Sequence, residues 1–235
     1  MNGTADMQFP TNTLTMKFAR GLLAILALAV LPLSAQADVL FSQLEPGGSY
    51  GAGGGFNVSG VSSFNNGQPV GYYSVGAQFT LNSDAFLSSI RLALTYLPQS
   101  SSHDVLIKLQ GSDQYGLPDG NIMASGVVTT DVPFGSSSAM LTSFSPVGPA
   151  IQLSGESTYW ITAEPTEAST YNAWNVIRGQ TGQSVAHSRN GTYYYLWGEL
   201  DWPAFQVTGT QVPEPSATAL LILGSAFFGQ TRRRY

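Results

Sequence analysis

The chain has 235 residues and no cysteine, which excludes disulfides, thiolate nucleophiles and metal sites built from cysteine. Only 10% of the residues are charged, and the formal net charge is −5. Between residues 38 and 211 the imbalance is larger, with twelve acidic residues against four basic ones. Because an acidic surface is repelled by phosphate backbones, the composition argues against nucleic acid as a partner.

The N-terminal segment has the layout of a secretory signal peptide over residues 16–37. Two basic residues precede an apolar run at residues 22–33, and small residues follow the run. The predicted cleavage site comprises Ala35, Ala37 and the new N-terminal residue Asp38. This pattern predicts passage through the secretion translocon and removal by signal peptidase. A retained membrane anchor is the alternative, disfavoured by the short apolar run. Residues 1–15 lack the pattern and are interpreted as an upstream extension.

Residues 38–211 are predicted to form one β domain. Apolar and polar residues alternate with period two in the segments 75–81, 88–97, 104–110 and 158–164. Turn residues separate these segments, and no stretch shows the apolar stripe of a helix. We therefore expect an all-β fold, an antiparallel β-sandwich of about ten strands in a jelly-roll-like arrangement.

Two stretches of this domain carry more specific expectations. Residues 39–44 are predicted to form the first strand, and the glycine-rich residues 45–60 are interpreted as a mobile loop that follows it. Residues 88–97 are predicted to form a single strand, whose alternation puts Leu94 and Thr95 on opposite faces.

Residues 111–126 contain two carboxylates near a predicted tight turn at residues 116–120. Asp113 and Asp119, with nearby carbonyl groups, offer the oxygen ligands that Ca²⁺ takes. The spacing departs from the D-x-[DN]-x-[DN]-G calcium motif, because non-ligating side chains occupy the later positions. A plain β-turn through Asp119 explains the same residues, so both interpretations stand. No other cofactor is predicted.

The sequence shows no convincing catalytic constellation. His103 and His187 are far apart, neither has metal-ligand spacing, and no G-x-S-x-G motif occurs. Carboxylates are available for glycoside hydrolysis, but acidic residues are common in any acidic protein. We therefore predict a protein that is not an enzyme, with a secreted polysaccharide-active hydrolase as the alternative.

The C-terminal third of the domain is rich in aromatic residues, and Trp160 and Trp174 lie nearby in sequence. Aromatic rings with a polar group suit stacking on sugars. The candidate glycan-binding residues are Tyr194, Trp197 and Trp202. Because neighbouring residues of a strand face opposite sides, part of this aromatic set is expected to be core instead.

The C-terminal segment, residues 212–235, combines a Pro-Glu-Pro motif, an apolar run at residues 217–229 and an arginine cluster. As a helix, the run would span about 20 Å at about 1.5 Å per residue. A bilayer core of about 30 Å makes this a short, weakly held hydrophobic helix. The positive-inside rule puts the arginines on the cytoplasmic side.

This order of features resembles the PEP-CTERM sorting signal of Gram-negative, exopolysaccharide-producing bacteria. The residues that carry the resemblance are Val212, Pro213, Glu214, Pro215, Arg232, Arg233 and Arg234. The resemblance implies transient anchoring in the inner membrane and removal of the tail by exosortase. It also implies delivery to the cell surface or extracellular matrix. An ordinary C-terminal anchor with an incidental Pro-Glu-Pro is the alternative.

Residues 77–81 and 111–126 are also similar to the choice-anchor domains found on many PEP-CTERM proteins, β-sandwiches of unassigned biochemical role. Together these resemblances imply an exported, exosortase-processed, non-catalytic surface or matrix protein. Contact with exopolysaccharide is part of this expectation.

Overall fold

The structure is a computed structural model. It describes residues 37–60, 64–65, 68–69, 72–136, 140–178, 185–189, 191–196 and 201–212. The predicted signal peptide through residue 36, Trp197 and the sorting signal from Pro213 onward lie outside the described residues. A search of the described residues for helices long and apolar enough to cross a membrane finds none.

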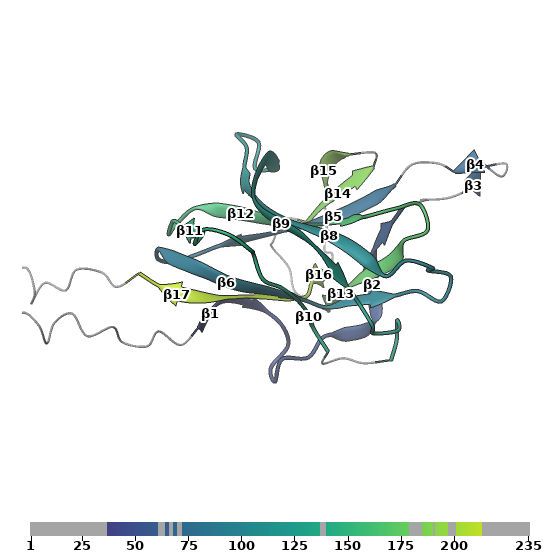
Figure 1. Ribbon diagram of the computed structural model, residues 1–235, viewed down its shortest axis with the longest axis horizontal. Helices are drawn as coiled ribbons and strands as arrows, with labels where there is room; N and C mark the ends of the chain where they lie inside the picture. The colour runs from purple at the N-terminus through teal and green to yellow at the C-terminus, as the bar shows by residue number, and fades with distance from the viewer. Residues whose placement is uncertain are drawn as a thin grey trace, which may run out of the picture. The chain divides into compact units, whose positions relative to one another are not determined.

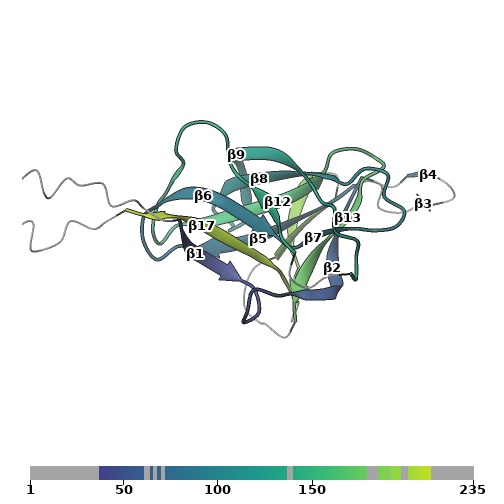
Figure 2. The ribbon, with the colours of Figure 1, turned by 60° about the horizontal axis from the view of Figure 1, so that its bottom comes forward.

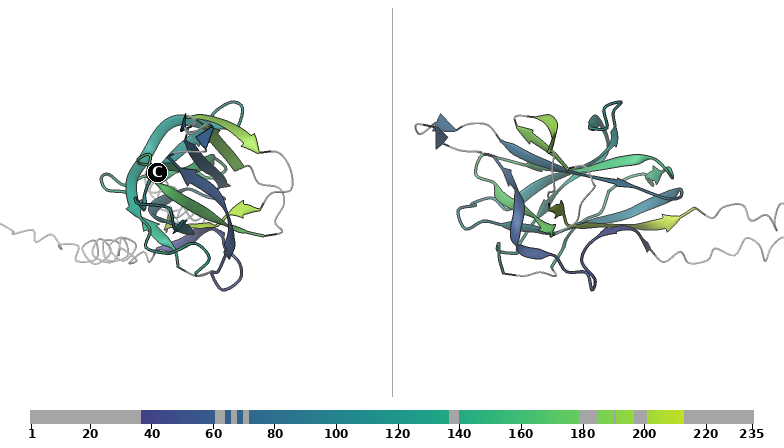
Figure 3. Two further views of the ribbon diagram at one scale, coloured as in Figure 1. Left: turned by 90° about the vertical axis from the view of Figure 1, so that its right-hand side faces the viewer. Right: turned by 180° about the vertical axis from the view of Figure 1, so that it is seen from behind.

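The described residues form two curled antiparallel sheets that face each other, with no helix between or around them (Figure 1). Sheet A has the strand order β1 (Asp38–Gln43), β17 (Phe205–Gln211), β6 (Ala85–Leu92) and β10 (Thr142–Phe144), and β11 (Gln152–Leu153) also pairs with β6. Figure 3 shows the sheets from one end and from behind. The prediction of an all-β antiparallel fold is confirmed.

Sheet B is larger, and several of its strands line the candidate site. Its main order is β16 (Trp202–Pro203), β13 (Tyr171–Ile177), β2 (Gly51–Ser59), β5 (Tyr73–Thr80), β12 (Thr158–Pro165), β8 (Asp104–Ser112) and β9 (Pro118–Thr129). Three further strands attach at its sides, namely β7 (Leu94–Tyr96) on β13, β14 (Val185–Arg189) on β5, and β15 (Thr192–Leu196) on β14. A separate ribbon pairs β3 (Phe64–Asn65) with β4 (Gln68–Pro69).

Figure 2 shows the two sheets from a second direction. An aromatic cluster lies in the core between them. From sheet A, the ring of Phe41 stacks on that of Phe205 with centroids 5.3 Å apart. From sheet B, the rings of Phe79 and Trp174 lie 6.0 Å and 6.1 Å from Phe205, both edge-on. The indole N–H of Trp174 donates to the carbonyl of Ala204 at 2.9 Å, so its polar atom is satisfied inside the core.

The expectation of a mobile loop over residues 45–60 is wrong for most of its length, because residues 51–59 form β2 in the middle of sheet B. Glycine is needed here for close approach between strands. A Cβ at Gly55 would lie only 2.9 Å from the carbonyl oxygen of Trp174 on β13. The glycine content therefore reflects tight strand packing at this position.

The single strand expected over residues 88–97 is also wrong, because the chain changes sheet at Ala93. The segment before Ala93 is β6 of sheet A, and the segment after it is β7 of sheet B. Ala93 N donates to Ala204 O at 3.0 Å, and Ala93 O accepts from Asn175 N at 2.8 Å. The crossing interrupts the alternation. Thr95 is consequently buried, with its hydroxyl donating to Asn175 Oδ1 at 2.7 Å.

Removal of the central ring of the aromatic cluster should destabilise the domain strongly. Phe205→Ala should lower the free energy of unfolding by about 3–5 kcal/mol, because it deletes a fully buried ring that contacts both sheets. Phe86→Ala is the matched control, since Phe86 on β6 is 40% exposed and should cost at most about 1 kcal/mol. Urea denaturation of the two variants measures the difference. Equal losses would contradict this placement of the core.

Candidate ligand-binding cleft on the outer face of sheet B

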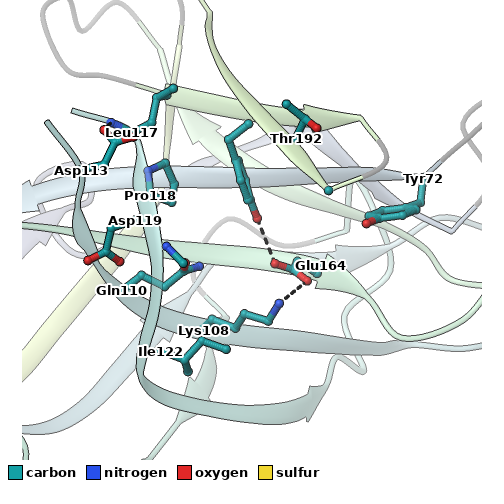
Figure 4. A pocket seen from close by; sticks show the side chains of 13 residues that line it. Tyr72, Lys108, Gln110, Asp113, Leu117, Pro118, Asp119, Ile122, Glu164 and Thr192 are labelled. Atoms are coloured by element: carbon teal, nitrogen blue, oxygen red, sulfur yellow. Dashed lines mark hydrogen bonds and ion pairs between the residues drawn. The ribbon is translucent and has the colours of Figure 1, made fainter. Parts of the chain in front are cut away.

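A cleft of about 480 Å³ lies on the outer face of sheet B, the face turned away from sheet A (Figure 4). The alternation of β8 sends Ile107 and Leu109 into the core and places Lys108 and Gln110 in the cleft. The turn between β8 and β9 lines one side, and the β14–β15 hairpin lines the other. The volume falls within the range of about 300–1,000 Å³ that is typical of ligand sites.

The carboxylate of Glu164, on β12, is held from two directions at the floor of the cleft. Lys108 Nζ lies 2.6 Å from Glu164 Oε2, and the Tyr193 hydroxyl donates to Glu164 Oε1 at 3.0 Å. The Lys108 and Glu164 side chains are only 21% and 17% exposed. Removal of either member of a largely buried ion pair leaves the other charge unpaired. Replacement of Lys108 or of Glu164 alone is therefore expected to destabilise the floor of the cleft.

Strand register explains how Tyr193 reaches a residue on a strand that is not its neighbour. Ser188 on β14 pairs with Ser74 on β5 and with Tyr193 on β15, so these side chains share one face of the sheet. From there the Tyr193 side chain extends to Glu164 on β12. Burial raises the pKa of the Tyr193 hydroxyl far above its usual range, and the negative charge of Glu164 raises it further. The hydroxyl therefore remains a hydrogen-bond donor.

The wall formed by the β8–β9 turn is fixed by hydrogen bonds to the outer face of the sheet. Trp160, on β12, is fully buried beneath the turn, and its indole N–H donates to Gly116 O at 2.9 Å. The Gln110 amide donates to Thr162 Oγ1 at 3.0 Å and accepts from Gly120 N at 3.1 Å. Both ends of the turn are thus tied to side chains of the floor, so the wall is formed without a ligand.

The predicted turn at residues 116–120 is displaced in the structure. The chain turns at residues 113–116, where Gly116 N donates to Asp113 O at 3.0 Å, and Pro118 already begins β9. Asp113 Oδ1 accepts from the backbone N–H groups of residues 115 and 117, at 2.8 Å and 2.9 Å. An aspartate that caps the backbone two residues ahead is a common turn signal, so the turn centres on Asp113.

The two residues of the calcium interpretation both line the cleft. Asp119 accepts from the backbone and side-chain nitrogens of Asn121 at 2.8 Å and 3.0 Å, and Asp113 is engaged in the turn. Within the part of the chain that the structure describes, no three His, Asp or Glu residues gather as a metal site would require. Calcium binding stays a prediction.

The aromatic residues that the sequence singled out have different placements. Trp160 and Trp174 are fully buried, in keeping with the expectation that part of the aromatic set is core. Trp202 opens β16, is half-buried and is not among the residues that line the cleft. Tyr194 lies in β15, next to Tyr193 in the chain, and Trp197 lies outside the described residues. A glycan-binding role for the candidate set stays a prediction.

The sequence points to Glu164 only as one acidic residue among several, and to Tyr193 only as part of the aromatic segment. It does not single out Lys108, Gln110 or Tyr72 as site residues. A signal for the floor was present. Lys108 and Glu164 carry opposite charges at outward positions of two predicted strands, and a cross-strand pair favours that arrangement. Only the register, in which Leu106 pairs with Glu164, brings them into contact.

Comparisons with known proteins do not supply a family for this chain. A scan against protein-family models finds no match. A search of the curated proteins finds no significant match either.

Both histidines of the chain are among the described residues, and neither lines the cleft. The ring of His103 stacks on Tyr96 with centroids 3.9 Å apart. The ring of His187, on β14, stacks on Tyr73 of β5 at 4.8 Å and helps to join the hairpin to the sheet. Burial lowers the pKa of His187 below its ordinary value of 6.5. Protonation of this ring therefore opposes the folded state.

Acidification should destabilise the protein partly through His187. Because its folded-state pKa is lowered, the folded protein binds fewer protons than the unfolded chain just below pH 6.5. The stability that the folded state owes to a neutral His187 ring is fully present above pH 6.5 and is lost as the pH falls through the lowered pKa. The melting temperature should therefore fall between about pH 7 and pH 5, and less steeply in His187→Gln. An unchanged slope in this variant would contradict the assignment.

Proposed function

We propose that this protein is an exported, non-catalytic component of the cell surface or extracellular matrix that binds a polysaccharide through the cleft on sheet B. The observation that carries the proposal is the lining of the cleft. It presents carboxylates, an ammonium group and tyrosine hydroxyls on a floor that hydrogen bonds already hold in place. Such groups match the many hydroxyls of a sugar, and tyrosine adds an apolar ring with a polar end.

The two ends of the domain support the export and sorting part of the proposal. The signal-peptide pattern and the PEP-CTERM-like tail together imply secretion, transient anchoring in the inner membrane and cleavage by exosortase. Asp38 on β1 pairs with Gly209 on β17, so both predicted processing sites flank the same pair of strands. We interpret the sandwich more finely as a jelly-roll-like domain of the choice-anchor kind, with the exported domain spanning residues 38–211.

A polysaccharide hydrolase remains the alternative because three carboxylates, those of Asp113, Asp119 and Glu164, line one cleft and hydrolysis needs a pair. The contacts of Glu164 favour the non-catalytic proposal. Both of its oxygens are engaged, one by the Lys108 ammonium and the other by the Tyr193 hydroxyl. A residue held in this way is well suited to position a ligand.

The C-terminus of the protein recovered from its own host should lie near the Pro-Glu-Pro motif. Mass spectrometry of the surface and medium fractions should find chains that end between Pro213 and Ser216. Replacement of Pro213, Glu214 and Pro215 by alanine should leave the tail intact and keep the protein in the membrane fraction. Intact tails ending at Tyr235 in the wild-type protein would instead indicate an ordinary C-terminal anchor.

The mature protein should bind the exopolysaccharide of its host, and the cleft should be needed for binding. Tyr72→Ala and Glu164→Gln each change the lining of the cleft and should weaken retardation in affinity electrophoresis by about tenfold or more. Tyr115→Ala is the matched control. Tyr115 is 73% exposed on the adjacent turn and is not among the residues that line the cleft, so binding should be unchanged.

Other outcomes of this experiment separate the remaining candidates. Loss of binding in Tyr194→Ala, Trp197→Ala or Trp202→Ala, with the cleft variants unaffected, would place the glycan on the aromatic segment. Loss of binding on addition of a chelator, reversed by Ca²⁺, would support the calcium interpretation of Asp113 and Asp119. Release of reducing ends from the polysaccharide would establish the hydrolase alternative.

A further inference from the structure

A second hollow of about 330 Å³ adjoins the cleft on the outer face of sheet B. It is lined by Gly60, directly after β2, and by residues 165–168, which comprise the last residue of β12 and the three that follow it. Tyr72 and Glu164 line both hollows, so the two spaces meet at these side chains. We call the two hollows together the groove. A groove of two compartments is longer than one small ligand requires.

Tyr72 stands at the junction of the two compartments (Figure 4). Its side chain remains 36% exposed, and its hydroxyl lies against the tip of the β14–β15 hairpin. A Cβ at Gly191 would be only 2.7 Å from this hydroxyl, and the φ of +86° at Gly191 favours glycine at the tip. The close contact with the hairpin restrains the ring while part of it stays open to a ligand.

The floor of the groove favours recognition by side chains. Strand β12 is paired on both sides, with β5 and with β8, and β8 is paired on both sides, with β12 and with β9. A peptide that binds by strand addition needs a free backbone edge, which these two strands do not offer. A polymer recognised through hydroxyl groups fits this floor better.

The charge of the groove limits the kind of polymer further. Its lining includes the carboxylates of Asp113, Asp119, Glu164 and Glu167 against one ammonium, that of Lys108. Lys108 is already paired with Glu164, so the excess charge is negative. A chain of uronic acids would be repelled, whereas a neutral chain or one of amino sugars would not.

We infer that the groove binds a linear, non-acidic polysaccharide chain that occupies both compartments at once, with Tyr72 between two adjoining subsites. The inference rests on the proposed glycan binding and adds to it the length and charge of the ligand. Because each compartment holds part of the same chain, contacts in the second add to those in the first.

Calorimetric titration of the mature protein with oligosaccharides of one to six units tests this inference. The probes are gluco- and manno-oligosaccharides as neutral chains, glucosamine oligomers as cationic chains and oligogalacturonates as anionic chains. The dissociation constant for a neutral or amino-sugar series should fall at least about tenfold from the monomer to the tetramer. Tyr72→Ala should remove most of this length dependence, and Tyr115→Ala should preserve it.

The outcomes distinguish the inference from the function on which it rests. Binding that does not strengthen with length, or that prefers the oligogalacturonates, would overturn the inference while leaving glycan binding intact. A length dependence that survives in Tyr72→Ala would overturn the placement of the two subsites. Failure of every series to bind would overturn glycan binding through the groove as well.

Discussion

The burial of Trp160 is the constraint on which the groove depends. Its side chain projects from the outer face of β12. A two-layer sandwich would ordinarily expose this face to water, yet the indole is fully buried. Gly76 on β5 makes room beside it, since a Cβ there would lie 3.2 Å from the ring. The indole N–H then donates to Gly116 O and holds the β8–β9 turn over the sheet. Because an indole must be both covered and hydrogen-bonded, one side chain creates a wall of the cleft.

The same burial explains how far the fold could be predicted from the sequence. The alternation in β12 assigns Tyr159, Ile161 and Ala163 to one face, and all three are in the core. Trp160 and Thr162, on the other face, are also fully buried, under segments far away in the chain. Period two identifies a strand, but it does not show what covers the second face. It also does not mark where a strand leaves one sheet for the other, as the chain does between β6 and β7.

The sequence pointed to some of the residues that line the cleft, but it did not show that they lie close together. The sequence drew attention to the carboxylates near residue 113 and to the tyrosines near residue 194. In the structure, Asp113 and Tyr193 both line one cleft. Their proximity depends on β5 and β12 lying between the hairpin and β8, and this order follows from long-range pairing. The floor was missed for the same reason, because Lys108 and Glu164 meet only through the β8–β12 register.

The arrangement of the two layers separates the proposed sorting of the protein from its proposed binding. Both ends of the described domain belong to sheet A, where β1 and β17 pair along their length. The groove lies on the outer face of sheet B, with the core between it and those strands. Cleavage of the proposed tail would therefore alter the chain after the last strand of sheet A, whereas the residues that line the groove belong to other segments. A protein held by its C-terminal tail would be attached through β17 of sheet A, the layer that does not carry the groove.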